Sequence, residues 1–311
     1  MGWDVRAGAA TVGGPALACP ACRTRLDSED GGFACGACGQ RYPVTDGVPV
    51  LLASPPRGEQ ADQAAYFDDW ADAEHEIERP VGTPAFHGRL LVEKFQRGVE
   101  AIRGLLPGAS ALAVCGGSGL DAELLSRAGA TVVTADISPG AARRALERAS
   151  RHGFPIVSVV GDAEALPFAD RSVDVVYVHD GLHHVERPLR AVAEMARVAK
   201  VAVSVNEPAR ALATEAAALA GLALRREEAG NPVRRLTVDE VARSLRAAGF
   251  RVVRARRYAM LYRHEAGSVS RLLSRRRLRP LAAGALSALD PIGARIGNKL
   301  TVQAVREGHE S

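Results

Sequence analysis

A glycine-rich turn followed by an acid is the segment of this sequence best suited to chemistry. The turn, ALAVCGGSG, spans residues 111–119, and the acid is Asp136, seventeen residues after Gly119 at the end of the run TVVTAD. Gly116, Gly117 and Gly119 allow a tight turn close to a ligand, and the helix expected after them offers free N–H groups. An acid about 20 residues further on can accept hydrogen bonds from ribose hydroxyls. The pattern predicts a nucleoside cofactor.

Four of the five cysteines form two CxxC pairs near the N-terminus. Cys19 and Cys22 make the first pair, and Cys35 and Cys38 make the second after twelve intervening residues. Two such pairs supply four thiolates on two tight knuckles, which predicts a closed, tetrahedral, structural zinc site. Redox chemistry of the thioredoxin type, the alternative, needs only one pair.

Three further motifs follow the glycine turn in order. The segment GDAEALPF, 161–168, comes after the β-branched run 156–160, and a second run, 173–178, leads into HDGLHH, 179–184. Together these motifs resemble the class I S-adenosylmethionine (SAM) dependent methyltransferases, specifically the small-molecule enzymes with GDAE-LPF and LHH signatures. The resemblance covers roughly residues 95–260. A nicotinamide-dependent Rossmann enzyme, the rival interpretation, explains none of the motifs after the turn.

The resemblance implies a cofactor site, with the ribose on Asp136 and the adenine on Asp162 and Ala163. The full set that it implies is Cys115, Gly116, Gly117, Gly119, Asp136, Ile137, Asp162, Ala163 and His179. The sequence departs from the family at Ala113, where the first strand usually ends in an acid, and at Cys115, where the turn usually opens with glycine. These departures imply a weakened pocket for the amino-acid end of SAM.

The catalytic candidates follow the fourth strand, at the sheet edge where open α/β sheets bind ligands. His184 and His183 could take a proton from an acceptor, since histidine titrates near neutral pH; the alternative is that one caps a helix or packs under the cofactor. Asp180 could orient a histidine or bind a substrate amine, or be a solvated loop carboxylate. The segment Asn206–Pro208 follows the fifth strand and is a further candidate to face the substrate. The sequence 179–182 lacks the Asn/Asp-Pro-Pro-aromatic clamp of nucleobase methyltransferases, which disfavours methylation of base amines.

The remaining elements complete an α/β fold, a doubly wound, seven-stranded, Rossmann-like sheet with a small N-terminal zinc ribbon. Apolar spacing predicts a helix over 187–200 and strands over 201–205, 250–258 and 300–305, and TVDE at 237–240 is a capping box opening a helix. We expect a ribbon over 1–53, a linker and helical lid over 54–104, and the methyltransferase domain over 105–311 with an insertion near 263–297. The ribbon resembles the zinc-ribbon activators of tRNA and protein methyltransferases. In the lid, Phe67 and Trp70 are expected either to close over the cofactor or to pack on the sheet.

Composition indicates an ordinary globular protein. The chain has 311 residues, 47% hydrophobic and 24% charged, with a formal net charge of +4. Residues 1–18 lack the apolar core of a signal peptide, and the apolar stretch 209–224 is interrupted by Arg210 and Glu215. We therefore expect a cytoplasmic protein without a membrane span.

These features predict a SAM-dependent methyltransferase acting on a small molecule at oxygen or a non-nucleobase nitrogen. An RNA methyltransferase is the first alternative, because an arginine cluster in the insertion could meet phosphates; its members are Arg271, Arg275, Arg276, Arg277 and Arg279. Such a cluster is more often a solvated face, so nucleic acid is the less favoured partner. A non-catalytic protein that binds SAM or a partner is the second alternative, motivated by Ala113 and Cys115.

Overall fold

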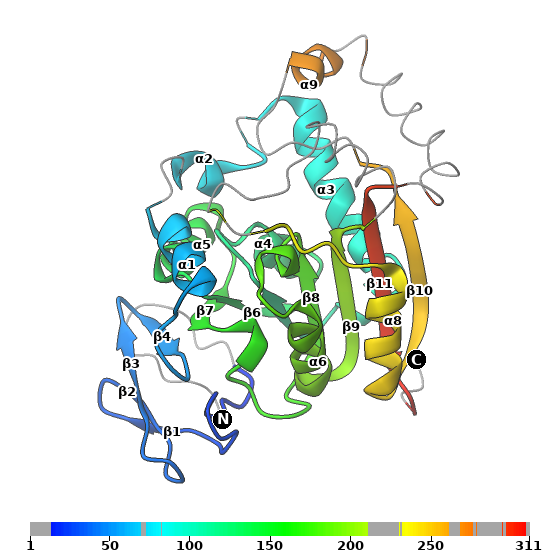
Figure 1. The fold of residues 1–311 in the computed structure, drawn as a ribbon. Helices are drawn as coiled ribbons and strands as arrows, with labels where there is room; N and C mark the ends of the chain where they lie inside the picture. Colours follow the sequence, from blue (N-terminus) through cyan, green and yellow to red (C-terminus); the bar gives the residue numbers. More distant parts are fainter. Residues whose placement is uncertain are drawn as a thin grey trace.

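The computed structural model describes residues 14–69, 73–81, 83–210, 230, 232–260, 268–275, 278, 294 and 297–308. Its centre is one sheet with the strand order β1-β2-β3-β4-β7-β6-β5-β8-β9-β11-β10 (Figure 1). Trp70, most of the stretch 209–224, and Arg276, Arg277 and Arg279 lie outside the described residues.

In the order in which they lie in the sheet, the seven strands β7-β6-β5-β8-β9-β11-β10 are those of the predicted sheet. Their bounds are β5 Ser110–Val114, β6 Thr131–Asp136, β7 Ile156–Gly161, β8 Val173–His179, β9 Ala199–Pro208, β10 Phe250–Tyr258 and β11 Lys299–Arg306. Strands β5 to β9 pair in parallel, whereas β11 runs antiparallel between β9 and β10. The α/β, Rossmann-like prediction is confirmed for this part of the sheet.

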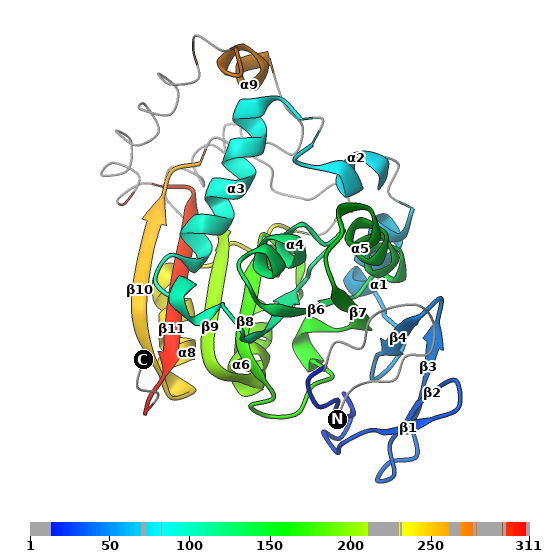
Figure 2. The ribbon, with the colours of Figure 1, turned by 180° about the vertical axis from the view of Figure 1, so that it is seen from behind.

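Helices cover both faces of the sheet, which makes the fold doubly wound (Figures 1 and 2). Their bounds are α3 Ala85–Val99, α4 Leu120–Arg127, α5 Pro139–His152, α6 Pro188–Val198 and α8 Val238–Ala247. Apolar side chains of α6 and α8 pack in one buried cluster, and those of α3, α4 and α5 pack in a second cluster on the opposite face. The central strands are almost continuously apolar because both of their faces are buried. The predicted capping box is present, with Thr237 accepting from the Glu240 N–H at the start of α8.

The N-terminal ribbon continues the main sheet. It contains β1 Asp27–Glu29, β2 Gly32–Ala34, β3 Arg41–Thr45 and β4 Val48–Leu51. β4 pairs in parallel with the carboxyl end of β7, matching Val50 with Val160 and Leu51 with Gly161. The continuous sheet therefore has eleven strands, more than the seven expected, because the ribbon adds its own strands to the β7 edge.

The segment between ribbon and sheet is helical, as expected. Besides α3 it contains α1 Glu59–Asp68 and α2 Ala73–Glu78, and a short α9, Ser268–Leu273, lies beside the N-terminal end of α3 (Figure 1). Two arginines of α5 hold this segment. The Arg144 guanidinium donates to the Phe67 carbonyl, and fully buried Arg148 donates to the Glu76 and Ile77 carbonyls at 2.9 and 2.8 Å.

No helix within the described ranges is both long and apolar enough to cross a membrane.

Candidate functional site

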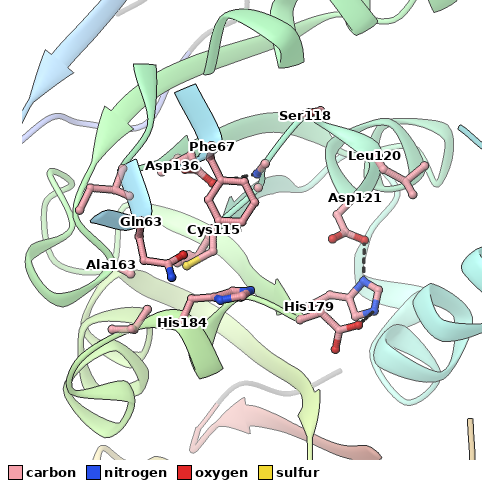
Figure 3. A pocket seen from close by; sticks show the side chains of 18 of the residues that line it. Gln63, Phe67, Cys115, Ser118, Leu120, Asp121, Asp136, Ala163, His179 and His184 are labelled. Carbon is pink, nitrogen blue, oxygen red and sulfur yellow. Dashed lines mark hydrogen bonds and ion pairs between the residues drawn. The ribbon is translucent and has the colours of Figure 1, made fainter. Parts of the chain in front are cut away.

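A cavity of about 260 Å³ opens at the carboxyl ends of β5, β6, β7 and β8 (Figure 3). Every predicted cofactor-binding or catalytic residue lines it except Gly119 and His183. Helix α1 contributes Gln60, Gln63 and Phe67 to the wall, so the segment predicted as a lid does reach the cavity.

The glycine turn forms one wall. Gly117 and Gly119 have φ values of 51° and 85°, and Gly119 is the N-cap of α4. A Cβ on Gly116 would lie 1.9 Å from Thr134 Oγ1, so this position excludes larger residues. Cys115 adopts a left-handed φ of 52°, a conformation that glycine adopts without strain. Burial, reinforced by the Asp136 carboxylate, raises the pKa of the Cys115 thiol well above its usual value, which disfavours a nucleophilic role.

Asp136 braces this turn from the end of β6. Its carboxylate accepts hydrogen bonds from the Gly117 N–H at 2.9 Å and the Ser138 N–H at 3.0 Å. Burial raises the pKa of the Asp136 carboxyl, although the two N–H donors act in the opposite direction. Ile137, which follows it, also lines the cavity.

Asp162 lies at the end of β7, beside the ribbon. Its carboxylate accepts from the Glu164 N–H at 2.8 Å and from Gln60 Nε2 at 3.0 Å. Burial raises the pKa of this carboxyl as well. Gln60 belongs to the predicted lid, and nothing in the sequence indicated its contact with Asp162.

The loop 179–184 is fixed by Glu207, a residue 1% exposed on β9. Its Oε1 accepts from the Gly181 and Leu182 N–H groups at 2.8 and 2.9 Å, and its Oε2 lies 2.9 Å from His183 Nδ1. This contact accounts for the absence of His183 from the cavity wall. The segment Asn206–Pro208, expected to face substrate, does not line the cavity either; Glu207 supports the loop from behind.

His184 reaches the cavity from this loop. Its ring packs edge-on against Phe67, with centroids 5.8 Å apart (Figure 3). Nδ1 is buried and has no hydrogen-bond partner among the described residues. Burial, with a smaller effect of neighbouring His183, lowers the pKa of His184 well below its usual value, so the imidazole is neutral near pH 7. A neutral imidazole can accept a proton.

Asp180 carries ion pairs that the sequence did not predict. Lys94 Nζ, from α3, and Lys299 Nζ, from β11, each donate to one of its carboxylate oxygens, and His179 Nε2 lies 3.3 Å away. Burial alone would raise the pKa of Asp180, but the two ammonium groups hold it well below its usual range. The interpretation of Asp180 as a solvated carboxylate is therefore wrong. His179 Nδ1 also lies 3.2 Å from Asp121 Oδ1, and Asp121 and Lys94 line the cavity.

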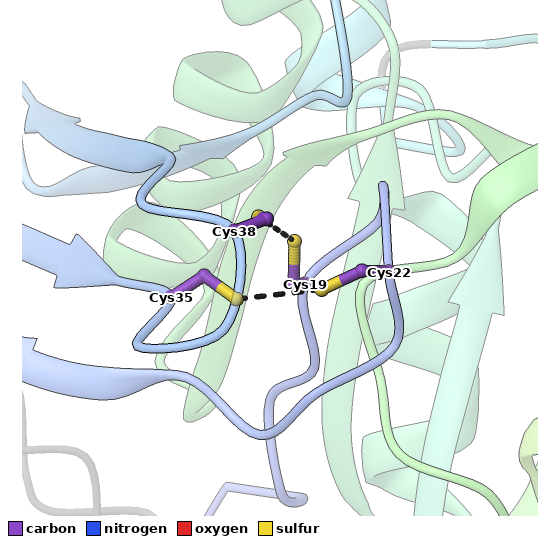
Figure 4. A group of neighbouring side chains, drawn as sticks. All are labelled: Cys19, Cys22, Cys35 and Cys38. Carbon is purple, nitrogen blue, oxygen red and sulfur yellow. Dashed lines mark hydrogen bonds between the residues drawn. The ribbon is translucent and has the colours of Figure 1, made fainter.

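The four predicted zinc ligands converge in the ribbon (Figure 4). One sulfur from each cysteine lies within 4.8 Å of all the others, with 3.6 Å between Cys19 and Cys38 and 3.4 Å between Cys22 and Cys35. Four cysteine sulfurs at this spacing fit the tetrahedral geometry that zinc prefers. The Tyr42 hydroxyl lies 3.0 Å from Cys19 Sγ, which fixes one ligand from outside the cluster.

Comparison with known proteins identifies two domains. Residues 112–205 match the model of a methyltransferase domain family, and residues 15–47 match that of the Trm112p-like proteins. Over these residues the two matches bear out the resemblances found in the sequence, to a methyltransferase domain and to a zinc ribbon of the activator type.

Relatives and solved structures agree with this assignment. The chain is 42% identical over 102 residues to a demethylmenaquinone methyltransferase of Renibacterium salmoninarum and 38% identical over 148 residues to one of Thermobifida fusca. These matches cover 33% and 45% of this chain and 41% and 57% of the relatives, so the likeness spans about half of each relative's length.

Two solved structures share the fold. Magnesium protoporphyrin IX methyltransferase from Synechocystis, with bound SAH, superimposes with a TM-score of 0.53 at 17% identity, covering 80% of this chain and all of that one. The cyclase SpnF gives a TM-score of 0.52 at 19% identity, covering 81% and 98%. A cyclase and a methyltransferase on one fold mean that activity has to be argued from the site.

Proposed function

We propose that this protein is a SAM-dependent methyltransferase that acts on a small molecule. The observation that carries the proposal is the convergence of Asp136, Asp162 and the loop 179–184 on one cavity beside the glycine turn. The names of the relatives, which are small-molecule methyltransferases, point the same way.

The residues of the cavity suit SAM from end to end. The Asp162 carboxylate and Ala163 would meet the adenine, and Asp136 would accept from the ribose hydroxyls. The backbone of Gly116 and Gly117, which lines the cavity, would meet the amino-acid end, with Cys115, Ile137 and His179 beside it, and Gly119 is the N-cap of the helix behind the turn. SAM, when bound, supplies a methyl group on a sulfonium that is already a good leaving group.

The protein's own contribution is then alignment and removal of a proton. Alignment of two reactants contributes about 7–11 kcal/mol in favourable cases, whereas a general base adds about 10²–10⁴-fold. His184 is the candidate base because it is neutral, lines the cavity and leaves Nδ1 without a partner among the described residues. His183 and Asp180 would serve to position the loop: Glu207 contacts the His183 ring, and the two lysines donate to the Asp180 carboxylate.

We assign one structural zinc ion to Cys19, Cys22, Cys35 and Cys38. The four-sulfur set leaves no open coordination position, so the metal would stabilise the ribbon and take no part in transfer.

Three measurements test the proposal. Native mass spectrometry of the purified chain should find one zinc and SAM or SAH, and calorimetry should find SAH binding that Asp136→Ala weakens and that Asp239→Ala, on the exposed surface of α8, leaves intact. SAM with a tritiated methyl group, incubated with the protein, metabolite extract and total RNA, should place label in the small-molecule fraction. Label confined to precipitated RNA would overturn the small-molecule assignment, and absence of SAH binding would overturn the cofactor assignment.

A further inference from the structure

Asp121 lines the cavity but was not among the residues predicted for it. It lies in the first turn of α4, just after the glycine turn, and its side chain is 15% exposed. Its Oδ1 lies 3.2 Å from Nδ1 of His179, at the end of β8. Its Oδ2 accepts no hydrogen bond from the part of the chain that the structure describes, so this oxygen can accept one from a ligand.

Three other carboxylates of the cavity hold two donors each. These are Asp136, Asp162 and Asp180. Asp121 contacts only the His179 ring among the described residues. A carboxylate that keeps an acceptor position at a cavity wall suits a cationic group of a ligand, because hydrogen bonds between two charged groups are the strong ones.

The charge of Asp121 also determines what this end of α4 can bind. The N-terminal end of a helix carries a partial positive charge, which favours anions and disfavours cations. The first turn of α4 has two acids, Asp121 and Glu123, and Glu123 is held by Arg127 and Arg148 at 2.7 Å each. Asp121 is therefore the acid that can make this helix end acceptable to a cation.

His179 holds the Asp121 carboxylate at the cavity wall. Its side chain is 8% exposed, and its Nε2 lies 3.3 Å from Asp180 Oδ2. Burial and the Lys94 ammonium lower the pKa of His179, but the Asp121 and Asp180 carboxylates have the larger combined effect and raise it above its usual value. The ring is thus fixed between two carboxylates.

The strand before the glycine turn supplies no acid. Ala113, where the resembling family usually has one, is 1% exposed and packs in the apolar cluster under α3, α4 and α5. Asp121 follows the same turn on its other side. A negative charge is therefore present beside the turn even though β5 carries none.

The cavity places this charge away from the adenine side. Asp121 and Ala163 lie on opposite sides of the cavity (Figure 3). A ligand with its adenine at Ala163 and its ribose at Asp136 would extend its third part, the amino-acid chain, toward Asp121. The positive group of that chain is its ammonium.

We infer, on the premise of the methyltransferase function proposed above, that Asp121 binds the ammonium group of the cofactor's amino-acid end and replaces the acid that is missing at Ala113. His179 is a positioning residue in this arrangement, because it acts through the Asp121 carboxylate. The amino-acid pocket then keeps its charge, which comes from α4 and not from β5.

Calorimetry with two ligands tests the inference. The ligands are SAH and deamino-SAH, in which a hydrogen atom replaces the α-amino group. Wild type should bind deamino-SAH at least about tenfold more weakly than SAH, because a charged hydrogen bond is lost. Asp121→Asn should weaken SAH binding at least about tenfold and leave deamino-SAH binding undiminished, so that the variant no longer distinguishes the two ligands.

The matched control is Asp239→Asn. Asp239 is exposed and occupies the second position of α8, as Asp121 does in α4, so this variant should keep the wild-type preference for SAH. Thermal unfolding without ligand checks that the variants fold. If Asp121→Asn does not fold, Asp121→Ser gives the same comparison with a small polar side chain.

Two results would overturn the inference. The first is equal affinity of wild type for SAH and deamino-SAH. The second is a loss of affinity in the Asp121 variant that is the same for both ligands, because the residue would then only support the turn. Failure of the wild-type protein to bind either ligand would instead refute the proposed function.

Discussion

Replacing Glu207 tests whether the loop that carries His184 depends on one buried carboxylate. Glu207 accepts hydrogen bonds from the N–H groups of Gly181 and Leu182 and contacts the His183 ring. The His183 N–H also donates to it at 3.3 Å. Because Asp180 has a left-handed φ of 50°, the chain turns sharply here and offers these N–H groups to one acceptor.

The structure gives the size of the effect. Hydrogen bonds to a charged group contribute about 1.5–3 kcal/mol each, and buried groups left unpaired add their own desolvation cost. Glu207→Gln keeps one accepting oxygen and should lower the free energy of unfolding by about 1–3 kcal/mol. Glu207→Ala leaves the N–H groups without an acceptor and should cost about 3–5 kcal/mol.

Urea denaturation of both variants measures the free energy of unfolding. The control is Glu307→Gln, at an exposed acid near the end of β11, which should stay within about 0.5 kcal/mol of wild type. Turnover should fall in Glu207→Gln more than SAH affinity does, since the loop positions His184 and the adenine side of the cavity is untouched. Unchanged stability in Glu207→Ala would show that the loop holds its shape without this residue and would refute the reasoning.

Four further outcomes follow from the site. Asp136→Ala should weaken SAH binding by at least about tenfold in calorimetry, because charged hydrogen bonds to ribose are lost. His184→Ala should lower kcat by about 10²-fold with SAH affinity nearly unchanged, and should remove the acid limb of the pH–rate profile; full turnover with the same pH dependence would exclude it as the base. The pKa of Asp180 is depressed in the folded protein, so the Asp180 carboxylate stabilises the fold above its ordinary pKa of 3.8, and this stabilisation is lost as the pH falls below 3.8. The acid unfolding curves of wild type and Asp180→Asn should therefore converge at low pH. Chelation should release one zinc, found by elemental analysis, and hydrogen exchange should rise over about residues 15–52 and at the carboxyl end of β7, because β4 pairs there.

The backbone of the site could be predicted from local patterns. β6 and β7 are short runs rich in β-branched residues, and an aspartate ends the first and directly follows the second, so the sequence alone is enough to put Asp136 and Asp162 at the sheet edge. The bounds of β10 matched the expected 250–258 because the capping box and Gly249 mark where the preceding helix begins and ends. Paired cysteines likewise indicate their own cluster, since metal geometry fixes their spacing.

The supporting contacts could not be predicted in this way. Lys94 and Lys299 are separated from Asp180 by long stretches of chain, and only the packing of α3 and β11 brings the three together. Glu207 has no local partner, and its role depends on the pairing of β8 with β9. The sequence held one signal that could have been used: the chain has only three lysines, and two of them are the residues that contact Asp180.

The ribbon and the adenine side of the cavity form one structural unit. β4 pairs with β7 up to Gly161, the residue before Asp162, and on the other side Leu17 bridges Phe168 while the Ala18 N–H donates to the Pro167 carbonyl. The ribbon therefore contacts both ends of the segment 161–168. In addition Gln60, which follows the ribbon in the chain, donates a hydrogen bond to Asp162. A ribbon of this size buries too little apolar surface to stay folded without the zinc ion that its cysteines would hold. Disorder of the ribbon would remove backbone partners from the segment that faces adenine, so the zinc ligands would affect cofactor affinity without touching the cofactor.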